Sequence, residues 1–357
     1  MPLKNVVILA ALFVAMLGGC KGSKAPDIPQ PPVDTTPTNT TTFKNPLLPS
    51  GPDPWVVQKD GFYYYTQTSG NKILLWKTQH IEELNKAIPV TVWTPTLGTE
   101  YSSDIWAPEI HFMDGKWYIY FAADNNGNNN THRIYALENE ATDPTTGTWS
   151  FKGKVAAATD KWAIDADVFA YNGSEYITWS GWQGDVDGEQ DIFIAKLTNP
   201  WTIDGDRALI SRPTYTWEKN NQAVLVNEGP EGLRNSGGKL FMTYSAGGCW
   251  TNDYCLGLLS LRDGGDPMNP TDWTKTPTPV FTKNPNGGAY GPGHNGFFIS
   301  PDSTQNWIIY HANAMPDQGC GDVRSPRIQP FTWNNDGSPN FGSPVSINVL
   351  IDKPSGE

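Results

Sequence analysis

The sequence predicts an all-β domain, a five-bladed β-propeller with its active site at one end of the central channel. Three observations support this fold: strand-like runs rich in aromatic and β-branched residues, turn signals before them, and a repeated spacing between those turns. Of the 357 residues, 35 are Gly and 30 are Pro, and 17% are charged. This composition excludes a coiled coil or a long-helix bundle, and the plentiful aromatic side chains exclude wholesale disorder.

Five similar strand-like segments recur along the chain, at residues 62–66, 117–121, 176–180, 240–245 and 307–311. The turns before them begin at Asp60, Asp114, Asn172, Asn235 and Pro301, with spacings of 54, 58, 63 and 66 residues. Asp-Gly and Asn-Gly are strong hairpin signals, because both central residues tolerate a positive φ. Five repeats of this length fit propeller blades with long loops over 44–351. The alternative, a two-domain sandwich, does not explain one period through the whole region.

The N-terminal segment predicts export and lipidation. Lys4 precedes an apolar run of 12 residues at 6–17, which suits a signal peptide and is too short to span a bilayer. The run leads into Gly18-Gly19-Cys20, which resembles the lipobox of bacterial lipoproteins; an ordinary signal peptide is the alternative. We therefore expect a signal peptide at 1–19, then a lipidated Cys20 and a Pro/Thr-rich tether at 20–43. The protein would be lipid-anchored in a bacterial cell envelope, periplasmic-facing or on the outer surface.

The formal net charge of −12 argues against nucleic acid as a partner, since phosphates require a basic surface. Three cysteines follow Cys20: Cys249, Cys255 and Cys320. An odd number in an exported protein leaves at least one free thiol. We expect either Cys249 or Cys255 to pair with Cys320, because the loops of adjacent blades meet on one face.

A ring of polar residues is predicted at the propeller axis, because the first strand of each blade lines the channel. Counting seven residues back from each turn gives Asp53, Ala107, Asp165, Glu228 and His294. Carboxylates are costly to bury, so three in one register indicate a function. The alternative is that each acid caps a turn at a strand start.

Three carboxylates around one pocket suit glycoside hydrolysis. One must be ionised to activate water, and another must be protonated to donate to the leaving oxygen. The third can keep the pKa of the acid raised by like-charge repulsion.

The motifs around these positions are PDPW, WAPEIH, IDADVF, NEGP and GPGHN, and they begin at residues 52, 106, 164, 227 and 291. In this order they resemble glycoside hydrolase family 43, over about 44–350. The resemblance implies an inverting, five-bladed enzyme acting on arabinose- or xylose-containing polysaccharides. It implies Asp53 as general base, Glu228 as general acid and Asp165 as the group that modulates the pKa of the acid.

The same resemblance implies a possible metal site and a specificity. His294 matches an axial histidine of the family that contacts a calcium ion or a water cluster, so a structural Ca²⁺ is the cofactor considered, with no organic one. The segment 327–333 (RIQPFTW) looks like that of the family's α-L-arabinofuranosidases. Asp167 departs from the family pattern. We expect it to face away from the channel, because alternation returns residue i+2 to the face of residue i only in a regular strand.

Substrate contacts are expected on the loops that follow the second strands. Trp182 and Trp250 lie on two of these loops, and Trp106 precedes the ring position Ala107. Indole faces stack well on sugars, although ordinary packing is the alternative for each. Arg327 is a candidate for binding substrate hydroxyls or orienting Glu228, with a surface salt bridge as the alternative.

The function expected is an exo-acting α-L-arabinofuranosidase, a monomer that acts on a plant-type pentose polysaccharide or oligosaccharide. A β-xylosidase and an endo-arabinanase share the catalytic acids and remain alternatives. A noncatalytic glycan-binding lipoprotein is the alternative from a different class.

Overall fold

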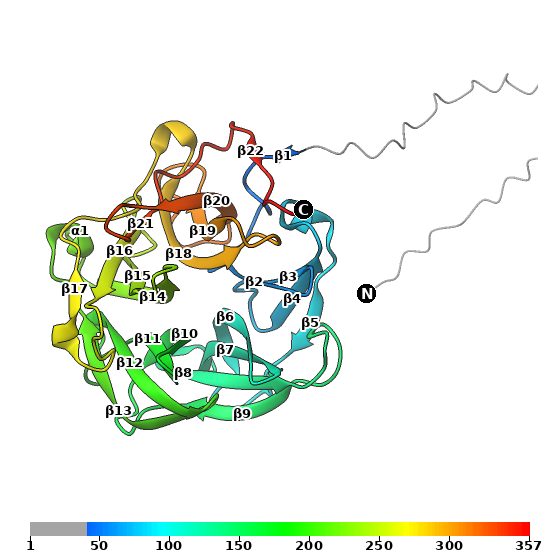
Figure 1. Cartoon of the computed structure of the whole chain (residues 1–357). Coiled ribbons are helices and arrows are strands. Elements are labelled where there is room, and N and C mark those ends of the chain that lie inside the picture. Colours follow the sequence, from blue (N-terminus) through cyan, green and yellow to red (C-terminus); the bar gives the residue numbers. More distant parts are fainter. Residues whose placement is uncertain (1–40) are drawn as a thin grey trace, which may run out of the picture. The chain divides into compact units, whose positions relative to one another are not determined.

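Five four-stranded antiparallel blades are arranged in a ring, as the repeat predicts (Figure 1). The computed structural model describes residues 41–357. The predicted signal peptide, Cys20 and most of the tether lie outside the described residues. No helix within 41–357 is long and apolar enough to cross a membrane.

Each blade contains four strands, ordered from the channel outward. Blade 1 is β2 (Trp55–Lys59), β3 (Phe62–Thr66), β4 (Ile73–Thr78) and β5 (Val90–Trp93), and blade 2 is β6 (Ser103–Met113), β7 (Lys116–Asn125), β8 (Asn128–Asn139) and β9 (Ser150–Val155). Blade 3 is β10 (Ala163–Tyr171), β11 (Ser174–Gly181), β12 (Glu189–Asn199) and β13 (Thr202–Ser211), and blade 4 is β14 (Leu225–Arg234), β15 (Leu240–Ala246), β16 (Cys255–Leu261) and β17 (Trp273–Lys275). Blade 5 is β18 (Tyr290–Ile299), β19 (Asn306–Asn313), β20 (Ser325–Trp333) and β21 (Pro339–Asn340). Short helical turns lie in the connections: η1 (Ile81–Lys86), α1 (Thr216–Lys219), η2 (Pro270–Asp272) and η3 (Pro285–Gly287).

The five predicted segments all lie in the second strand of a blade: β3, β7, β11, β15 and β19. The Asp-Gly and Asn-Gly turns of blades 1 to 3 have positive φ at both residues, as the hairpin prediction requires. A short parallel pairing, Glu189 with Leu225 and Gln190 with Val226, joins the sheets of blades 3 and 4.

The ring of blades is closed by the two ends of the described chain. β1 (Thr42–Phe43) pairs with β22 (Ile351–Asp352), beside blades 1 and 5 (Figure 1). Thr42 and Phe43, which lie in the segment expected to be the tether, are thus paired with the C-terminal end of the described chain.

The hydrophobic core consists mainly of five clusters, each shared by two neighbouring blades. Tyr64 and Leu75 of blade 1, for example, pack with Ile119 and Tyr135 of blade 2. The clusters between blades 2 and 3, 3 and 4, 4 and 5, and 5 and 1 follow the same plan. Since each sheet buries both faces against its neighbours, the blades are fixed around the channel and their innermost strands are held in place.

A bulge interrupts the innermost strand of blades 2 to 5 near the channel mouth. The regular pairing breaks after Trp106, Ile164, Glu228 and Gly293. The next residue of each strand has a left-handed φ: Ala107 41°, Asp165 56°, Gly229 51° and His294 48°. Asp53, just before β2, has the same conformation at φ 54°. A non-glycine residue there costs about 1–2 kcal/mol, so the repeated bulge is a constrained feature that directs side chains at the channel.

Candidate active site

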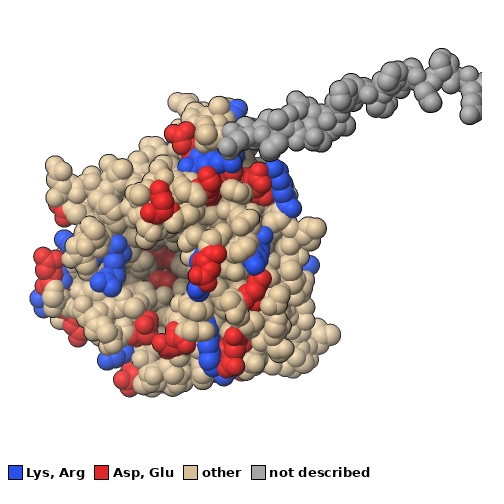
Figure 2. Space-filling view, turned by 45° about the vertical axis from the view of Figure 1, so that its right-hand side comes forward, with Lys and Arg blue, Asp and Glu red and all other residues tan. Residues whose placement is uncertain are grey.

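A pocket of about 570 Å³ lies at the mouth of the channel and is lined by Asp53, Asp165, Glu228 and His294. Loops that follow the second strands of all five blades contribute to its wall, as predicted, through residues such as Thr68, Asn129, Asp187, Trp250 and Asp322. Figure 2 shows a face of the molecule that is hollowed near its middle, with acidic side chains visible in the hollow.

Asp53 is held as a carboxylate by contacts to both of its oxygens. Arg324 Nη1 donates to Oδ1 at 2.8 Å, and the Thr68 hydroxyl donates to Oδ2 at 2.8 Å. Burial alone would raise the pKa of Asp53, but the charge of Arg324, the two nearby histidines and the Thr68 hydrogen bond hold this pKa well below its usual range. This environment therefore favours the ionised form of Asp53.

His294 and His311 surround Asp53 from blade 5. Their Nδ1 atoms lie 3.4 Å and 3.5 Å from Asp53 Oδ1. His311 Nδ1 also accepts a hydrogen bond from the Asp53 backbone N–H at 3.1 Å. Burial lowers the pKa of both histidines, which limits the positive charge that they can place beside Asp53.

Glu228 has the opposite electrostatic setting. Burial, the largest cause, and the charge of Asp53 raise the pKa of Glu228 to about 7, although a hydrogen bond from Tyr254 works against the rise. The Tyr254 hydroxyl donates to Oε1 at 2.7 Å. Two carboxylates in one pocket with their pKa values pushed apart suit one base and one acid.

Asp165 lies beside Glu228 and accepts a hydrogen bond from Gly229, the residue that follows Glu228. The Gly229 backbone N–H donates to Asp165 Oδ2 at 3.1 Å. Burial and the charge of Glu228 raise the pKa of Asp165 well above its usual value. Asp165 and Glu228 are thus a pair of like charges, and adding one proton to the pair relieves the repulsion between them.

Glu228 does not occupy the same strand position as the other ring residues. The left-handed position of its blade is Gly229, where an added Cβ would approach His294 to 3.4 Å. Counting seven residues back from the turn misses this position in blade 4, because the strand between the bulge and the hairpin is shorter there. It comprises residues 231–234 in blade 4 and residues 167–171 in blade 3. The Glu228 side chain nevertheless reaches the same pocket.

The tryptophan predictions divide into two groups. Trp106 and Trp250 line the pocket, and Trp250 is 44% exposed. Trp182 is only 2% exposed and stacks on Trp162 with ring centroids 4.7 Å apart. The prediction for Trp182 is therefore wrong: it supports Trp162, which lines the pocket and which sequence reasoning missed.

Arg327 is not a substrate contact in this structure. It is fully buried, and its guanidinium donates to the backbone carbonyls of Gly288 and Ala312 at 2.7 Å and 3.4 Å. It is therefore neither the pocket residue nor the surface salt bridge considered from the sequence. The arginine that reaches the pocket is Arg324, three residues earlier, where the chain enters β20.

A disulfide forms part of the pocket wall. Cys249 and Cys320 are bonded, with their Cα atoms 5.1 Å apart, and both line the pocket. Cys255 is buried and free. Of the two alternatives left open by the sequence, the structure has Cys249 as the partner of Cys320, across blades 4 and 5.

The groups around His294 fit a calcium ion poorly. Its Nδ1 faces Asp53, and the nearby Asp53 Oδ1 already accepts from the cationic Arg324. Calcium is bound by six to eight oxygen ligands, and here the protein would supply few of them. A calcium ion beside His294 would have to be held mainly through water.

Asp167 faces the channel interior, contrary to the prediction. Its Oδ2 accepts from the Gly232 backbone N–H of blade 4 at 2.8 Å, and it lies close to Glu109 and His111 of blade 2. The prediction rested on an irregular strand, and the bulge at residues 165–166 does interrupt the pairing, but pairing resumes at Asp167 with the carboxylate directed inward. Glu109 and Glu231 are also buried in this region and were missed, although both lie in or beside the quoted motifs.

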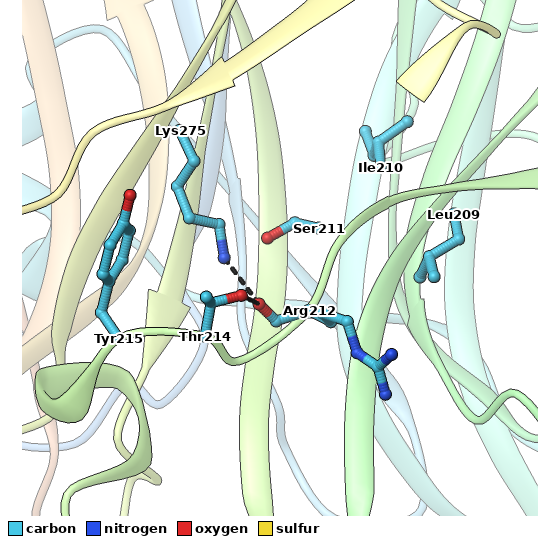
Figure 3. A pocket seen from close by; sticks show the side chains of 7 residues that line it. All are labelled: Leu209, Ile210, Ser211, Arg212, Thr214, Tyr215 and Lys275. Atoms are coloured by element: carbon cyan, nitrogen blue, oxygen red, sulfur yellow. Dashed lines mark hydrogen bonds between the residues drawn. The ribbon is translucent and has the colours of Figure 1, made fainter. Parts of the chain in front are cut away.

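A second hollow, of about 340 Å³, lies between the outer strands of blades 3 and 4 (Figure 3). Lys275 Nζ points at the Arg212 carbonyl at 2.7 Å and contacts Glu218 Oε1 at 2.6 Å. The Arg212 guanidinium turns away from Lys275 (Figure 3). It forms an ion pair with Glu189. Since these charges are already paired, the hollow has no reactive constellation.

Comparisons with known proteins agree with this geometry. Residues 43–339 match the family described as "Glycosyl hydrolases family 43". An "Extracellular exo-alpha-(1->5)-L-arabinofuranosidase" of Streptomyces avermitilis is 39% identical over 349 residues, which cover 96% of this chain and 70% of that protein. Another protein of the same description, from Streptomyces chartreusis, is 37% identical over 76% of this chain and 82% of its own length. The crystal structure of an α-L-arabinofuranosidase from Lactobacillus brevis superposes with a TM-score of 0.80 at 36% identity, covering 86% of this chain and 98% of that one.

Proposed function

Because the chain belongs to the glycosyl hydrolases of family 43, we propose that it is an exo-acting α-L-arabinofuranosidase that inverts the anomeric carbon. The observation that carries the proposal is a single pocket in which Asp53 is held ionised while the pKa of Glu228 is raised to about 7. The specificity for arabinose is proposed from the relatives described above. The substrate would be an arabinan or arabinoxylan-type polysaccharide or its oligosaccharides.

In the proposed reaction Asp53 acts as the general base and Glu228 as the general acid. Asp53 removes a proton from a water molecule, whose oxygen forms a bond to the anomeric carbon from the side opposite the leaving group. The glycosidic C–O bond breaks as Glu228 gives its proton to the leaving oxygen. The products are arabinose of inverted anomeric configuration and a shortened chain with a free hydroxyl. Loss of the Asp53 proton to solvent and uptake of one by Glu228 restore the enzyme.

Asp165 would act on Glu228 rather than on the sugar. Its bond to the Gly229 N–H fixes the backbone beside Glu228, and its proximity keeps the proton on the acid. Trp106, Trp162 and Trp250 supply apolar faces for the sugar ring.

The three alternatives give different results in one set of assays. The full chain should hydrolyse an aryl α-L-arabinofuranoside much faster than an aryl β-D-xyloside, and should release only arabinose from linear arabinan. Preference for the xyloside would indicate a β-xylosidase, and arabino-oligosaccharide products would indicate an endo-arabinanase. Binding of arabinan without hydrolysis of either aryl glycoside would indicate a glycan-binding protein.

We also propose that the enzyme acts as a monomer tethered to the cell envelope through a lipid on Cys20. The sequence around Cys20 supports the anchor, and two relatives are described as extracellular. Expression of the full gene in a bacterium should place the protein in the membrane fraction, and Cys20→Ser should release it. An unchanged distribution of the variant would refute the lipid anchor.

A further inference from the structure

A second group of acidic side chains lies inside the channel, further along the innermost strands than the catalytic carboxylates. Glu109 and His111 come from β6, Asp167 from β10 and Glu231 from β14. All four residues are buried. Glu109, His111 and Asp167 each offer a ligand atom, and these atoms lie within 4.8 Å of one another. Three adjacent blades thus converge on one point.

This cluster has no basic partner to balance its charge. Among the ion pairs of residues 41–357, the one that involves any of these carboxylates joins Glu109 Oε2 to His111 Nε2 at 3.2 Å. His111 is itself buried, and its imidazole is the nitrogen donor of the group. A neutral imidazole is a metal ligand, whereas it cannot offset three buried carboxylates.

Glu231 gives a second, independent indication that a cation binds to this cluster. The residue is 1% exposed, and its carboxyl group approaches Glu109 and lies within the influence of Asp167. Its Oε1 is nevertheless buried without a hydrogen-bond partner. An unpaired carboxylate oxygen is costly inside a protein, and a bound cation would satisfy it.

We propose that Glu109, His111, Asp167 and Glu231 bind a divalent metal cation that ties blades 2, 3 and 4 together below the active-site pocket. Carboxylate oxygens suit Ca²⁺ and Mn²⁺, and the imidazole favours a first-row transition metal. The donor set is richer than the one around His294, which offers the channel no free carboxylate. The competing explanation is that protons, shared between the acids, hold the cluster together.

Metal content and thermal unfolding of the full chain separate these explanations. After chelation and buffer exchange, Ca²⁺, Mn²⁺ and Zn²⁺ should each be tested alone. At least one should bind at about one equivalent per chain and raise the Tm by several degrees at saturation, because it binds the folded state. If none of the three binds above background and none changes the Tm, the cation proposal is wrong.

Isosteric variants locate the ion. Glu231→Gln and Asp167→Asn should abolish stoichiometric binding and the ion-dependent rise in Tm. His294→Gln and Glu175→Gln, the latter a half-buried acid of β11, should retain both. Both proteins are compared in saturating metal. If the Tm of Glu231→Gln equals or exceeds that of the wild type, protons rather than a metal ion hold the cluster together. Retained binding in both channel variants, with loss in His294→Gln, would move the ion to the His294 level and overturn the proposal. Should a channel variant fail to fold, the wild-type metal content and Tm still decide.

Discussion

Arg324 Nη1 lies 2.8 Å from Asp53 Oδ1, and this contact joins the proposed general base to the edge of the fifth blade. Arg324 enters the pocket from the turn before β20, whereas Asp53 precedes β2. The pair thus lies where the first and last blades meet. The ionisation of the base depends on the closed ring, because the two residues are far apart in the sequence.

Replacing Arg324 should change the acid side of the pH profile. In Arg324→Ala the loss of the nearby positive charge raises the pKa of Asp53, by roughly one to three units for a pair of this kind. Asp53 must be ionised to act as a base, so activity should now be lost at a higher pH on the acid side. Arg324→Lys keeps the charge and serves as the control. An unchanged acid limb in Arg324→Ala would mean that Arg324 does not set the ionisation of the base.

The alkaline limb should report Glu228. The acid must hold its proton, so kcat/KM on an arabino-oligosaccharide should fall as pH rises through about 7, the pKa of Glu228. Tyr254→Phe removes a hydrogen bond that favours the ionised form, so it raises this pKa and should move the alkaline limb to higher pH. A shift of the limb to lower pH in Tyr254→Phe would contradict the assignment.

Asp165→Asn should move the same limb in the opposite direction. The amide oxygen can still accept from the Gly229 N–H, but the like charge beside Glu228 is gone. The pKa of Glu228 therefore falls, and the alkaline limb should move down by roughly one pH unit. At pH 7 the protonated fraction of Glu228 would then fall from about one half to about one tenth, so we expect kcat/KM at pH 7 to drop by about fivefold. Pre-steady-state and pH-rate measurements would show whether the loss follows the proton on Glu228.

The cysteines allow a direct chemical test. With Cys20 replaced by Ser, the denatured, unreduced chain should show one free thiol, that of Cys255, and three after reduction. The disulfide closes a loop with a sequence separation of 71 residues. Cys249→Ser should lower the free energy of unfolding by about 4 kcal/mol in the chain-entropy model. Three free thiols before reduction would exclude the bond.

Local sequence signals predicted the hairpin turns and the repeat of the blades. The Asp60-Gly61 and Asn172-Gly173 turns indicate hairpins because their backbone requirement is strictly local. The repeat of these turns then places Asp53 and Asp165 at the channel. Neither inference needs knowledge of distant contacts.

What the sequence could not predict depends on small irregularities and on neighbours from other blades. One residue fewer between bulge and hairpin displaces Glu228 from its expected register. The strand is irregular at residues 165–166, yet Asp167 still faces inward, where it accepts from the Gly232 N–H of blade 4. Trp182 and Arg327 lie on the expected segments, but contacts with residues distant in the sequence bury them. Trp162 stacks on Trp182, and the carbonyls of Gly288 and Ala312 bind Arg327. Burial of this kind depends on contacts that no short sequence window contains.

The central claim is that Glu228 donates the proton and Asp53 activates the water, and leaving-group dependence tests it most directly. The measurement is kcat/KM for Glu228→Gln and Asp53→Asn on an arabino-oligosaccharide and on an aryl arabinofuranoside with a strongly acidic phenol. Glu228→Gln should lose about 1,000-fold or more on the oligosaccharide yet stay within about tenfold of wild type on the aryl substrate, which needs no proton. Asp53→Asn should lose activity on both, because both need the activated water. Equal losses on the two substrates for both variants would contradict the assignment.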